Sequence, residues 1–292
     1  MSTGAPQPTV GAVVLTMNDR PEEFPRAMAS LLAQEGIDLD VIVVGNGCKP
    51  QQVPSGVRTV ELAENLGIPE GRNVGAANVK GDLLFFFDND AHLPRTDVLA
   101  RLAAELLKDT QLAYVQPRIA DPDTGVTLRR WVPRLKASDA SRPGIVTVMA
   151  EGVVMIRRDA FEAAGGWPGH FFLFHEGIDL SWRLWDHGGI GHYVPDIVVH
   201  HPATDPARHD RFYRLNARNR VWLARRNLPR PLLPLNLATF ALLTMWRFRD
   251  RNALKSTLTG FREGLRNDCG TRTPMSWSTV ARLTRAGRPP IF

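Results

Sequence analysis

The chain has 292 residues, enough for one large domain or for one domain with a small appendage. Hydrophobic residues make up 43% of it and charged residues 23%, which is typical of a soluble globular protein. The two cysteines, Cys48 and Cys269, exclude a disulfide framework and a cysteine-based metal cluster, and they fit a reducing compartment.

The formal net charge of +6 is distributed unevenly along the chain. Residues 1–200 carry 18 basic and 25 acidic side chains, a net charge of −7. Residues 201–292 carry 18 basic and 5 acidic side chains, a net charge of +13. This asymmetry indicates that the C-terminal third meets an anionic partner: a membrane surface, a polyanionic substrate or nucleic acid. The alternative is a solvated basic face.

The N-terminal residues lack the basic start and apolar run of a secretory signal. The longest apolar stretch, residues 232–246, is interrupted by Pro234 and Asn236 and is too short to span a bilayer comfortably. It predicts a buried or interfacial helix. We therefore expect a cytoplasmic location, with peripheral association at the inner face of the membrane as the alternative.

The first half of the chain predicts strands that alternate with helices. Continuous apolar runs predict buried strands, at residues 10–16, 39–44, 57–62 and 82–87. Helical spacing predicts helices that start at Pro21 and at Pro69. This alternation indicates an α/β fold with a mostly parallel sheet, in which ligands bind beyond the carboxyl ends of the strands. Asn18 and the segments 45–47 and 88–90 fall at those ends, so one pocket can collect them.

The pattern changes in the middle of the chain. After a helix predicted at 97–108, shorter apolar runs predict strands of a mixed sheet, at residues 113–117, 126–132 and 145–156. A helix is predicted from Glu176 to Asp186, and a strand near residues 192–199. From Pro206 onward the pattern is helical and rich in arginine, and residues 285–292 are expected to form a loose tail.

Asp88, Asn89 and Asp90 directly follow the strand predicted at 82–87. Two carboxylates one residue apart at a strand end can both reach one divalent cation, and oxygen ligands suit Mg²⁺ or Mn²⁺. Such a cation would also hold a diphosphate and neutralise it as it leaves. The alternative is an ordinary turn, but the position after an apolar strand favours the metal site.

A second acidic pair, Glu176 and Asp179, lies at the start of a predicted helix. Residues three apart share one face of a helix, so both carboxylates can meet one site. Three phenylalanines between 171 and 174 would desolvate Glu176 and raise its pKa toward the range of a general base. The alternative is structural, because acidic residues favour the first turn of any helix.

His200 and His201 follow the strand predicted near 192–199. Neighbouring residues of an extended segment point to opposite sides, so only one of them can easily serve a given site. A nitrogen from this pair could complete the coordination begun by Asp88 and Asp90. The alternative is a packed or solvated histidine.

These segments form one ordered series of motifs along the chain. The series comprises Thr16 to Arg20, Val43 to Gly47, Asn65 to Gly67 with Gly71 to Asn73, Phe87 to Asp90, Gly165 to Trp167, His175 to Arg183 and His200. It resembles the family 2 glycosyltransferases of the GT-A fold, including bacterial rhamnosyl- and galactofuranosyltransferase-like members, over roughly residues 10–226.

The resemblance implies a Rossmann-like, mostly parallel central sheet flanked by helices. A catalytic domain would occupy residues 1–205, with a nucleotide-sugar half at about 10–118 and an acceptor half at about 119–205. Residues 206–292 would form a basic helical extension. The implied reaction is an inverting transfer of a hexosyl or deoxyhexosyl group from a nucleoside-diphosphate sugar to an acceptor hydroxyl, assisted by Mn²⁺ or Mg²⁺.

The resemblance also implies roles for individual residues. The nucleoside pocket would be lined by Thr16, Asn18, Arg20 and Asn46, while Arg72 and Asn73 would lie near the nucleotide and its phosphates. Asp88 and Asp90 would form the metal motif, with Asp88 also near the donor. His200 falls where some members supply a further metal ligand. The segment around Glu176 would supply the catalytic base.

Two positions depart from the family pattern. Gly45 stands where the second strand commonly ends in an aspartate, which puts a base or ribose contact in doubt. Gly177 stands where the acidic motif commonly has the aspartate that acts as base. The base is then Glu176, Asp179 or a group elsewhere; we favour Glu176, with Asp179 as the second choice or as an orienting residue.

The apolar stretch 232–246 is followed at once by Arg247, Arg249, Arg251 and Lys255. An apolar helix beside a basic cluster can lie at an anionic membrane interface, which would suit a lipid-linked acceptor. A polysaccharide or a small molecule is the alternative acceptor. The helix could instead pack on the catalytic domain or on a second subunit of a homodimer. No nucleic-acid-binding module is recognised, so nucleic acid is not an expected partner.

Two other functions fit parts of the pattern. A nucleotidyltransferase also places carboxylates at strand ends, but residues 16–21 lack the glycine-rich, lysine-containing phosphate loop of that class. A catalytically silent protein that binds nucleotide sugars, or serves as a scaffold, would be consistent with Gly177.

Overall fold

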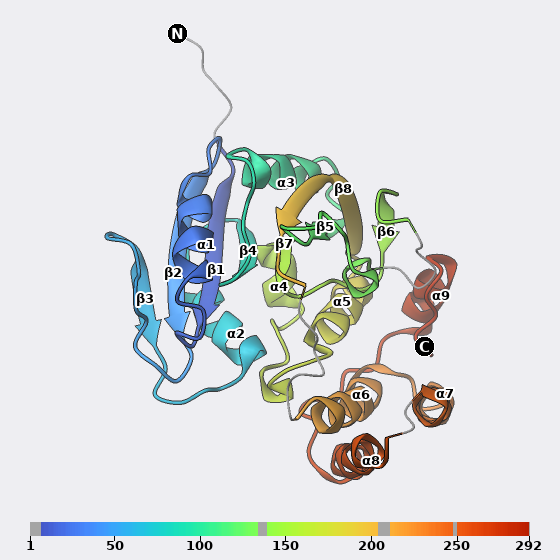
Figure 1. Cartoon of the computed structure of the whole chain (residues 1–292). Helices are drawn as coiled ribbons and strands as arrows, with labels where there is room; N and C mark the ends of the chain where they lie inside the picture. The colour runs from blue at the N-terminus through green and yellow to red at the C-terminus, as the bar shows by residue number, and fades with distance from the viewer. Residues whose placement is uncertain (1–6, 134–138, 204–210, 248–249, 292) are drawn as a thin grey trace.

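A computed structural model of the chain describes residues 7–133, 139–203, 211–247 and 250–291. Within these residues one sheet of eight strands, in the order β3-β2-β1-β4-β7-β5-β8-β6, runs through the molecule and is flanked by helices (Figure 1). The strands are β1 (Thr9–Thr16), β2 (Asp38–Gly45), β3 (Arg58–Glu61), β4 (Leu83–Asp88), β5 (Leu112–Ala120), β6 (Gly144–Val146), β7 (Val153–Arg157) and β8 (Ile190–His200). The helices are α1 (Glu23–Leu32), α2 (Ile68–Asn78), α3 (Val98–Leu107), α4 (Arg158–Ala163), α5 (Glu176–Asp186), α6 (Phe212–Asn227), α7 (Leu232–Arg247), α8 (Arg251–Arg266) and α9 (Trp277–Arg285).

The first four strands in space, β3, β2, β1 and β4, are parallel, as the alternating pattern predicts. Their apolar runs are buried on both faces because α1 and α3 cover one side and α2 covers the other. Helix α2 lies directly on β1 because it presents glycine there. A Cβ at Gly75 would stand 2.2 Å from the Val13 side chain, and one at Gly71 would stand 2.5 Å from Leu15.

The second half of the sheet is mixed. Strand β7 pairs antiparallel with both β4 and β5, β8 pairs parallel with β5, and β6 pairs antiparallel with β8. The antiparallel β7 is what brings the chain back beside β4, so residues just before β7 lie next to those just after β4. The antiparallel pairing of β7 with β4 therefore determines which residues meet at the carboxyl end of β4.

Three sequence-based expectations differ from the structure. The strand expected at 126–132 is a loop with a short 3-10 helix at Arg129–Trp131, because Asp121 closes a turn by accepting from Thr124 and none of the described strands pairs with this segment. The single strand expected at 145–156 is divided into β6 and β7. Helix α4 was not expected; its first residue, Arg158, anchors it by donating to the carbonyls of Ala76 and Val79.

The C-terminal helices pack against the α/β part through α5. A buried cluster joins Trp182 and Trp185 of α5 to Trp222 of α6 and Leu283 of α9. The segment after α9 is packed and not a loose tail, since Asn236 donates to the carbonyl of the buried Pro290 at 3.1 Å. The expected boundary between residues 205 and 206, and Arg249, lie outside the described residues.

No helix in the described ranges is both long enough and apolar enough to cross a membrane.

Candidate active site

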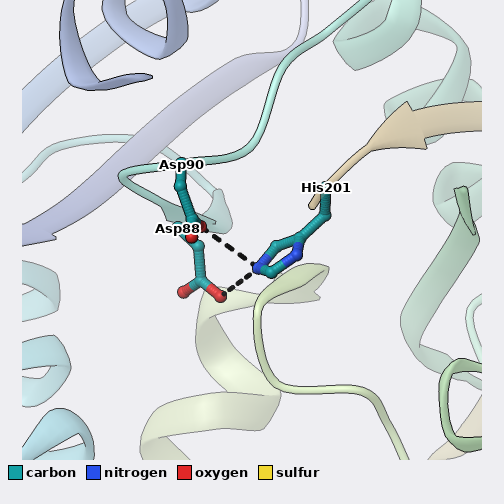
Figure 2. Close-up of side chains that lie close together, drawn as sticks. All are labelled: Asp88, Asp90 and His201. Atoms are coloured by element: carbon teal, nitrogen blue, oxygen red, sulfur yellow. Dashed lines mark ion pairs between the residues drawn. The ribbon is translucent and has the colours of Figure 1, made fainter. Parts of the chain in front are cut away.

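Three side chains converge at the carboxyl end of β4 (Figure 2). Asp88 is the last residue of β4, Asp90 lies two residues further on, and His201 follows β8. The Nε2 atom of His201 is 3.4 Å from an oxygen of Asp88 and 3.2 Å from an oxygen of Asp90. The three potential ligand atoms all lie within 4.8 Å of one another, so the group can hold one divalent cation.

The electrostatics of His201 show how strongly this group attracts a cation. Burial alone would lower the pKa of His201, but hydrogen bonds and charge from Asp88 and Asp90 outweigh it and raise that pKa to about 10. The two carboxylates therefore favour positive charge at the position of the His201 ring. The Trp131 ring covers the imidazole edge-on at 5.6 Å between centroids.

The structure places His201, not His200, beside the aspartates, which differs from the assignment made by resemblance. His200 is the last residue of β8, and its backbone exchanges two hydrogen bonds with His92. Its ring stacks on the His92 ring at 5.9 Å. The next residue in the extended segment points to the opposite side, where Asp88 and Asp90 lie. The sequence-based argument that only one histidine of the pair serves the site agrees with this arrangement.

Arg72 and Arg20 bring positive charge to the same carboxylates. Arg72, from α2, is 4% exposed and donates from Nη2 to Asp88 at 2.7 Å. Its Nη1 atom is buried without a hydrogen-bond partner among the described residues. Arg20 lies against Asp90 at 3.3 Å, closer to the metal group than a purely nucleoside-lining role would require. The free Nη1 of Arg72 is an unmet donor suited to a phosphate oxygen.

The remaining residues expected at the donor pocket shape its loops. Asn46 is buried, donates to Asn65 at 2.9 Å and accepts from the amide of Leu66, so its side chain holds the loop that leads into α2. Asn18, at a positive φ of 58°, donates to the carbonyl of Lys49 and ties the β1 loop to the β2 loop. The buried Thr16 accepts from the amide of Asn18 at 3.0 Å.

Asn73 likewise has its amide committed within the protein. It donates to the carbonyl of Trp167 at 2.9 Å and accepts from the amide of Trp167 at 2.8 Å. Arg72 lies over the ring of the same tryptophan, 5.3 Å from its centroid. Asn73 therefore fixes the platform that supports Arg72.

The departure at Gly45 has a local cause. A Cβ at this position would lie 2.0 Å from the carbonyl oxygen of Cys48 and 2.7 Å from the ring of Pro50. The loop after β2 folds back over the strand end, so no side chain fits where the family commonly has an aspartate.

Glu176 lies at the start of α5 and is 3% exposed. Its Oε2 atom has no hydrogen-bond partner among the described residues. Burial, and then the nearby charge of Glu151, raise the pKa of Glu176 to about 8. Burial also raises the pKa of Glu151 itself. Burial therefore disfavours the charged form of both carboxyls, and the charge of Glu151 disfavours it further at Glu176.

Glu151 explains the departure at Gly177. The carboxylate of Glu151 accepts from the amide of Gly177 at 2.9 Å. A Cβ at Gly177 would lie 2.5 Å from Cγ of Glu151 and 2.7 Å from its carboxyl carbon. The Glu151 side chain thus occupies the space that an aspartate at position 177 would need, and it supplies a carboxylate there.

Asp179 is occupied by a different set of contacts. It is fully buried, accepts from Arg183 at 2.9 Å and from Arg226 at 3.2 Å, and accepts from Asn227 at 2.6 Å. Burial would raise the pKa of Asp179, but these cations and hydrogen bonds hold it below its ordinary value. With both oxygens engaged, Asp179 fixes α5 to α6.

Sequence reasoning missed Glu151 altogether. It precedes β7, far in sequence from the other site residues, and it reaches the site only because β7 returns antiparallel beside β4. The backbone of Gly152 accepts from the amide of Asp88 at 3.0 Å, and a Cβ at Gly152 would lie 2.3 Å from Asp88. An acidic residue followed by glycine before an apolar run was the only available signal.

The segment that leads into α5 is strained. Phe172, Phe174 and His175 have φ angles of 68°, 74° and 69°, a region that residues with a side chain rarely adopt. Asn219 of α6 holds the segment by donating to the carbonyls of Phe171, Leu173 and Phe174. The position of Glu176 therefore depends on a residue in the C-terminal helices.

The architecture is similar to solved glycosyltransferase structures. GalNAc-T7, determined with UDP, GalNAc and Mn²⁺, superposes with a TM-score of 0.63 at 13% identity, over 98% of this chain and 58% of that one. The mannosyltransferase PcManGT from Pyrobaculum calidifontis, in complex with GDP-Man and Mn²⁺, gives 0.59 at 19% identity, over 97% and 82%. S. aureus TarS 1-349 gives 0.60 at 14% identity, over 88% and 81%. Identities this low show the shared fold alone, which is GT-A.

Two sequence comparisons add to this likeness. Over 61 residues the chain is 39% identical to an N-acetylglucosaminyl-diphospho-decaprenol L-rhamnosyltransferase of Mycobacterium tuberculosis. That match spans 19% of this chain and only 20% of the relative. The model of Glycosyl transferase family 2 matches residues 12–165, more than half of the chain. The chain therefore belongs to glycosyl transferase family 2.

Proposed function

We propose that this protein is an inverting glycosyltransferase that moves a sugar from a nucleoside-diphosphate sugar to an acceptor hydroxyl. One observation carries the proposal: a cation-attracting group of two carboxylates and an imidazole lies beside the unpartnered Nη1 of Arg72 and near a buried pair of glutamates. The first two features suit a diphosphate, and the third suits removal of a proton. Family membership and the GT-A fold support this interpretation.

On the donor side, Asp88, Asp90 and His201 would hold Mn²⁺ or Mg²⁺. When bound, the cation would neutralise negative charge on the diphosphate. Arg72 adds a hydrogen bond from Nη1 to a phosphate oxygen, and Arg20 adds a second positive charge. The loops that Asn18 and Asn46 hold in place would enclose the nucleoside.

On the acceptor side, the pair Glu151 and Glu176 acts as the base. One ionised carboxylate takes the proton from the acceptor hydroxyl while the oxygen forms a bond to the anomeric carbon. The bond from that carbon to the diphosphate breaks at the same time, and its electrons leave with the nucleoside diphosphate. A single displacement from the opposite face inverts the anomeric configuration.

The silent-protein alternative loses its main support at this site. Gly177 removes the family's usual aspartate, but Glu151 places a carboxylate in the same space. The nucleotidyltransferase alternative has no feature in its favour beyond the strand-end carboxylates that both classes share.

Release of nucleoside diphosphate tests the proposal directly. We expect a panel of nucleoside-diphosphate hexoses and deoxyhexoses, an L-rhamnosyl donor included, to contain one that is hydrolysed in the presence of Mn²⁺. Asp90→Ala should abolish this release, and Asp123→Ala, in the exposed turn after β5, should retain it. If no donor is hydrolysed, or if Asp90→Ala is fully active, the proposed function is wrong.

The base is tested separately. Glu176→Gln should lower the rate of transfer by about 10² to 10⁴-fold, the usual contribution of a general base, and leave donor binding unchanged. A thermal shift with donor and Mn²⁺ reports that binding independently of the chemistry. Full activity of Glu176→Gln would refute the assignment.

We further propose that α7 and α8 contact an anionic membrane surface, which would suit a lipid-linked acceptor. On α7 the side chains of Leu242, Met245 and Trp246 are 64%, 60% and 80% exposed. Arg251 and Lys255 follow in sequence, as exposed residues in the first turns of α8. Exposed apolar side chains beside basic ones are typical of interfacial helices.

Sedimentation with vesicles that contain an anionic phospholipid tests this contact. Trp246→Glu should reduce the bound fraction. Trp277→Glu, at an exposed tryptophan on α9, is the matched control and should not. Equal binding by both variants would exclude α7 as the contact.

A further inference from the structure

Helix α8 presents two unlike faces. One side packs against α6 and contains the buried residues of the helix, Ala253, Thr257, Gly260 and Gly264. A Cβ at Gly260 would overlap the carbonyl oxygen of Arg214, and one at Gly264 would lie 2.6 Å from Cβ of Val221. Because the inner face is fixed in this way, the residues half a turn further round the helix face outward. In Figure 1, α8 lies at the outer edge of the molecule, with α6 between it and α5.

A hollow of about 290 Å³ opens on this outer face of α8. Its lining consists of three basic residues, two leucines and a threonine: Arg251, Lys255, Arg262, Leu254, Leu258 and Thr259. Positions three, four, seven, eight and eleven residues apart lie on one face of a helix, so these six side chains point to the same side. All the described residues that line the hollow thus come from α8.

The hollow is positively charged. It has no acidic residue among the described residues that line it, and its three cations form no ion pair within the described part of the chain. The two nearest acids in the sequence are engaged elsewhere. Asp250 accepts from the amide of Ala253 at 2.6 Å, and Glu263 pairs with Arg214 at 2.7 Å. An anion in the hollow would therefore meet cations whose charge no described acid offsets.

Apolar side chains accompany the basic ones. Leu258, in the hollow, is 50% exposed, and Leu265, seven residues further along the same face, is 48% exposed. A free phosphate in water would gain nothing from these leucines, whereas a lipid offers acyl chains to them and a phosphate to the cations. Basic side chains beside apolar ones on the outer face of a helix are typical of binding at an anionic membrane surface.

The spacing of the cations indicates how much charge the bound headgroup carries. Arg262 follows Arg251 by eleven positions, about 16 Å of helix axis. A single phosphate is much shorter than this distance, whereas a headgroup with two phosphates offers one to Arg251 and Lys255 and the other to Arg262. We propose that the outer face of α8 binds the headgroup of a membrane phospholipid that carries two phosphates. The inference rests on the membrane contact proposed for α7 and α8, to which it adds a lipid and a binding site.

Vesicle binding at matched surface charge tests the proposal. The full chain is titrated with phosphatidylcholine vesicles that contain either cardiolipin, which carries two phosphates, or twice its mole fraction of phosphatidylglycerol, which carries one. Attraction by net charge alone gives equal binding to the two kinds of vesicle. A headgroup site gives tighter binding to cardiolipin, and we expect a difference of at least about fivefold, the effect of one basic side chain at a membrane surface.

Two variants locate the site. Lys255→Gln and Arg262→Gln should each weaken binding to cardiolipin vesicles by about fivefold and reduce the preference for cardiolipin. Arg285→Gln removes the same charge from an exposed arginine at the end of α9, and this matched control should keep the preference. The proposal is overturned if the wild type binds both kinds of vesicle equally. It is also overturned if Arg285→Gln loses the preference as fully as the two α8 variants do.

Sedimentation velocity without lipid shows whether a second copy of the chain covers this face instead. A monomer, or an oligomer that Leu258→Gln leaves intact, agrees with the lipid site because the outer face of α8 is then free. A dimer that Leu258→Gln dissociates would assign the face to a second copy and overturn the proposal.

Donor hydrolysis and the Trp246 variant separate this inference from the proposed function. Mn²⁺-dependent donor hydrolysis should be unchanged in Lys255→Gln and Arg262→Gln, because their side chains lie on the outer face, away from α6. Absence of hydrolysis by the wild type would refute the transferase function and leave the vesicle result in place. Equal binding to both kinds of vesicle, reduced for both in Trp246→Glu, would refute the headgroup site and keep the membrane contact. Absence of binding to either kind would refute both.

Discussion

At the scale of single residues, the pair Glu151 and Glu176 has a consequence for stability. The pKa of Glu176 is raised from 4.5 to about 8, so the folded state holds a proton that the unfolded chain releases above pH 4.5. Between these two values the folded state binds more protons, and its stability falls as the pH rises. Below pH 4.5 the effect is absent, and above about 8 the loss is complete.

We therefore expect Glu176→Gln to become progressively more stable than the wild type as the pH rises from 5 to 8. The limit for one proton is about 1.4 kcal/mol per pH unit. Chemical denaturation in EDTA at several pH values measures the difference. Glu64→Gln, at an exposed glutamate, is the control for the charge change alone. Parallel stability curves for Glu176→Gln and the wild type would contradict the raised pKa.

The carboxylate of Glu151, which occupies the space of an aspartate at position 177, gives a second prediction at this scale. Gly177→Asp alone should destabilise the protein and reduce transfer, because its Cβ would lie 2.5 Å from Cγ of Glu151. Glu151→Ala alone should lose most of the transfer rate. The double variant combines the freed space with a carboxylate at position 177, so its rate should exceed that of either single variant. Unimpaired transfer by Glu151→Ala would show that Glu151 has no part in the reaction.

At the scale of elements, the strained segment before α5 is held from outside. Positive φ at Phe172, Phe174 and His175 costs of order 1–3 kcal/mol each and persists only where surrounding contacts impose it. Asn219 holds the segment in this conformation because its side-chain amide donates hydrogen bonds to three of the segment's carbonyls. The segment 171–175 and α6 therefore form one working unit, although about 40 residues separate them in sequence.

Asn219→Ala should lower the free energy of unfolding by about 1–3 kcal/mol, since it leaves buried carbonyls without their donor. Its effect on the transfer rate should exceed its effect on donor binding, because Glu176 follows the released segment. Kinetics and donor thermal shifts measure the two separately. Asn78→Ala, which removes an exposed asparagine contact within α2, should change neither quantity much. A variant that lost donor binding and kept the transfer rate would contradict this role.

The success of sequence reasoning also depended on the element. Strands β1, β2 and β4 and helix α5 were predicted well because each is a continuous apolar run or a periodic pattern with clear ends. The strand expected at 126–132 was wrong, because a short run rich in apolar residues does not by itself create a pairing partner. The tail after α9 was misjudged because its contacts, such as Asn236 with Pro290, come from another element.

The residues of the candidate site also differ in how far the sequence could predict them. The parallel alternation places Asp88 and Asp90 at a strand end, whereas Arg72 was assigned from the family resemblance. Choosing His201 over His200 required the register of the pairing with His92, which no residue pattern states. Glu151 required the antiparallel return of β7 beside β4. Long-range topology, not residue type, limited the prediction.

At the scale of the whole molecule, the C-terminal helices are part of the catalytic unit. Asp179 of α5 binds Arg226 and Asn227 of α6, and the aromatic cluster of Trp185 and Trp222 surrounds this contact. The same helices supply Asn219 to the base segment. The extension and the α/β part should consequently unfold together, in one transition.

Asp179→Asn tests this coupling, because it removes the only carboxylate that Arg183 and Arg226 contact within the described residues. Two buried guanidiniums would remain without a counter-charge, so we expect a loss of about 3–5 kcal/mol in unfolding free energy. Asp186→Asn, at the far end of α5, removes an exposed acceptor and should cost much less. Denaturation followed by far-UV circular dichroism and by tryptophan fluorescence should give coincident transitions for the wild type. In Asp179→Asn, a tryptophan transition that precedes the loss of secondary structure would show that the Asp179 contact joins the C-terminal helices to the α/β part. Unchanged stability would mean that the aromatic cluster alone holds the helices to the α/β part.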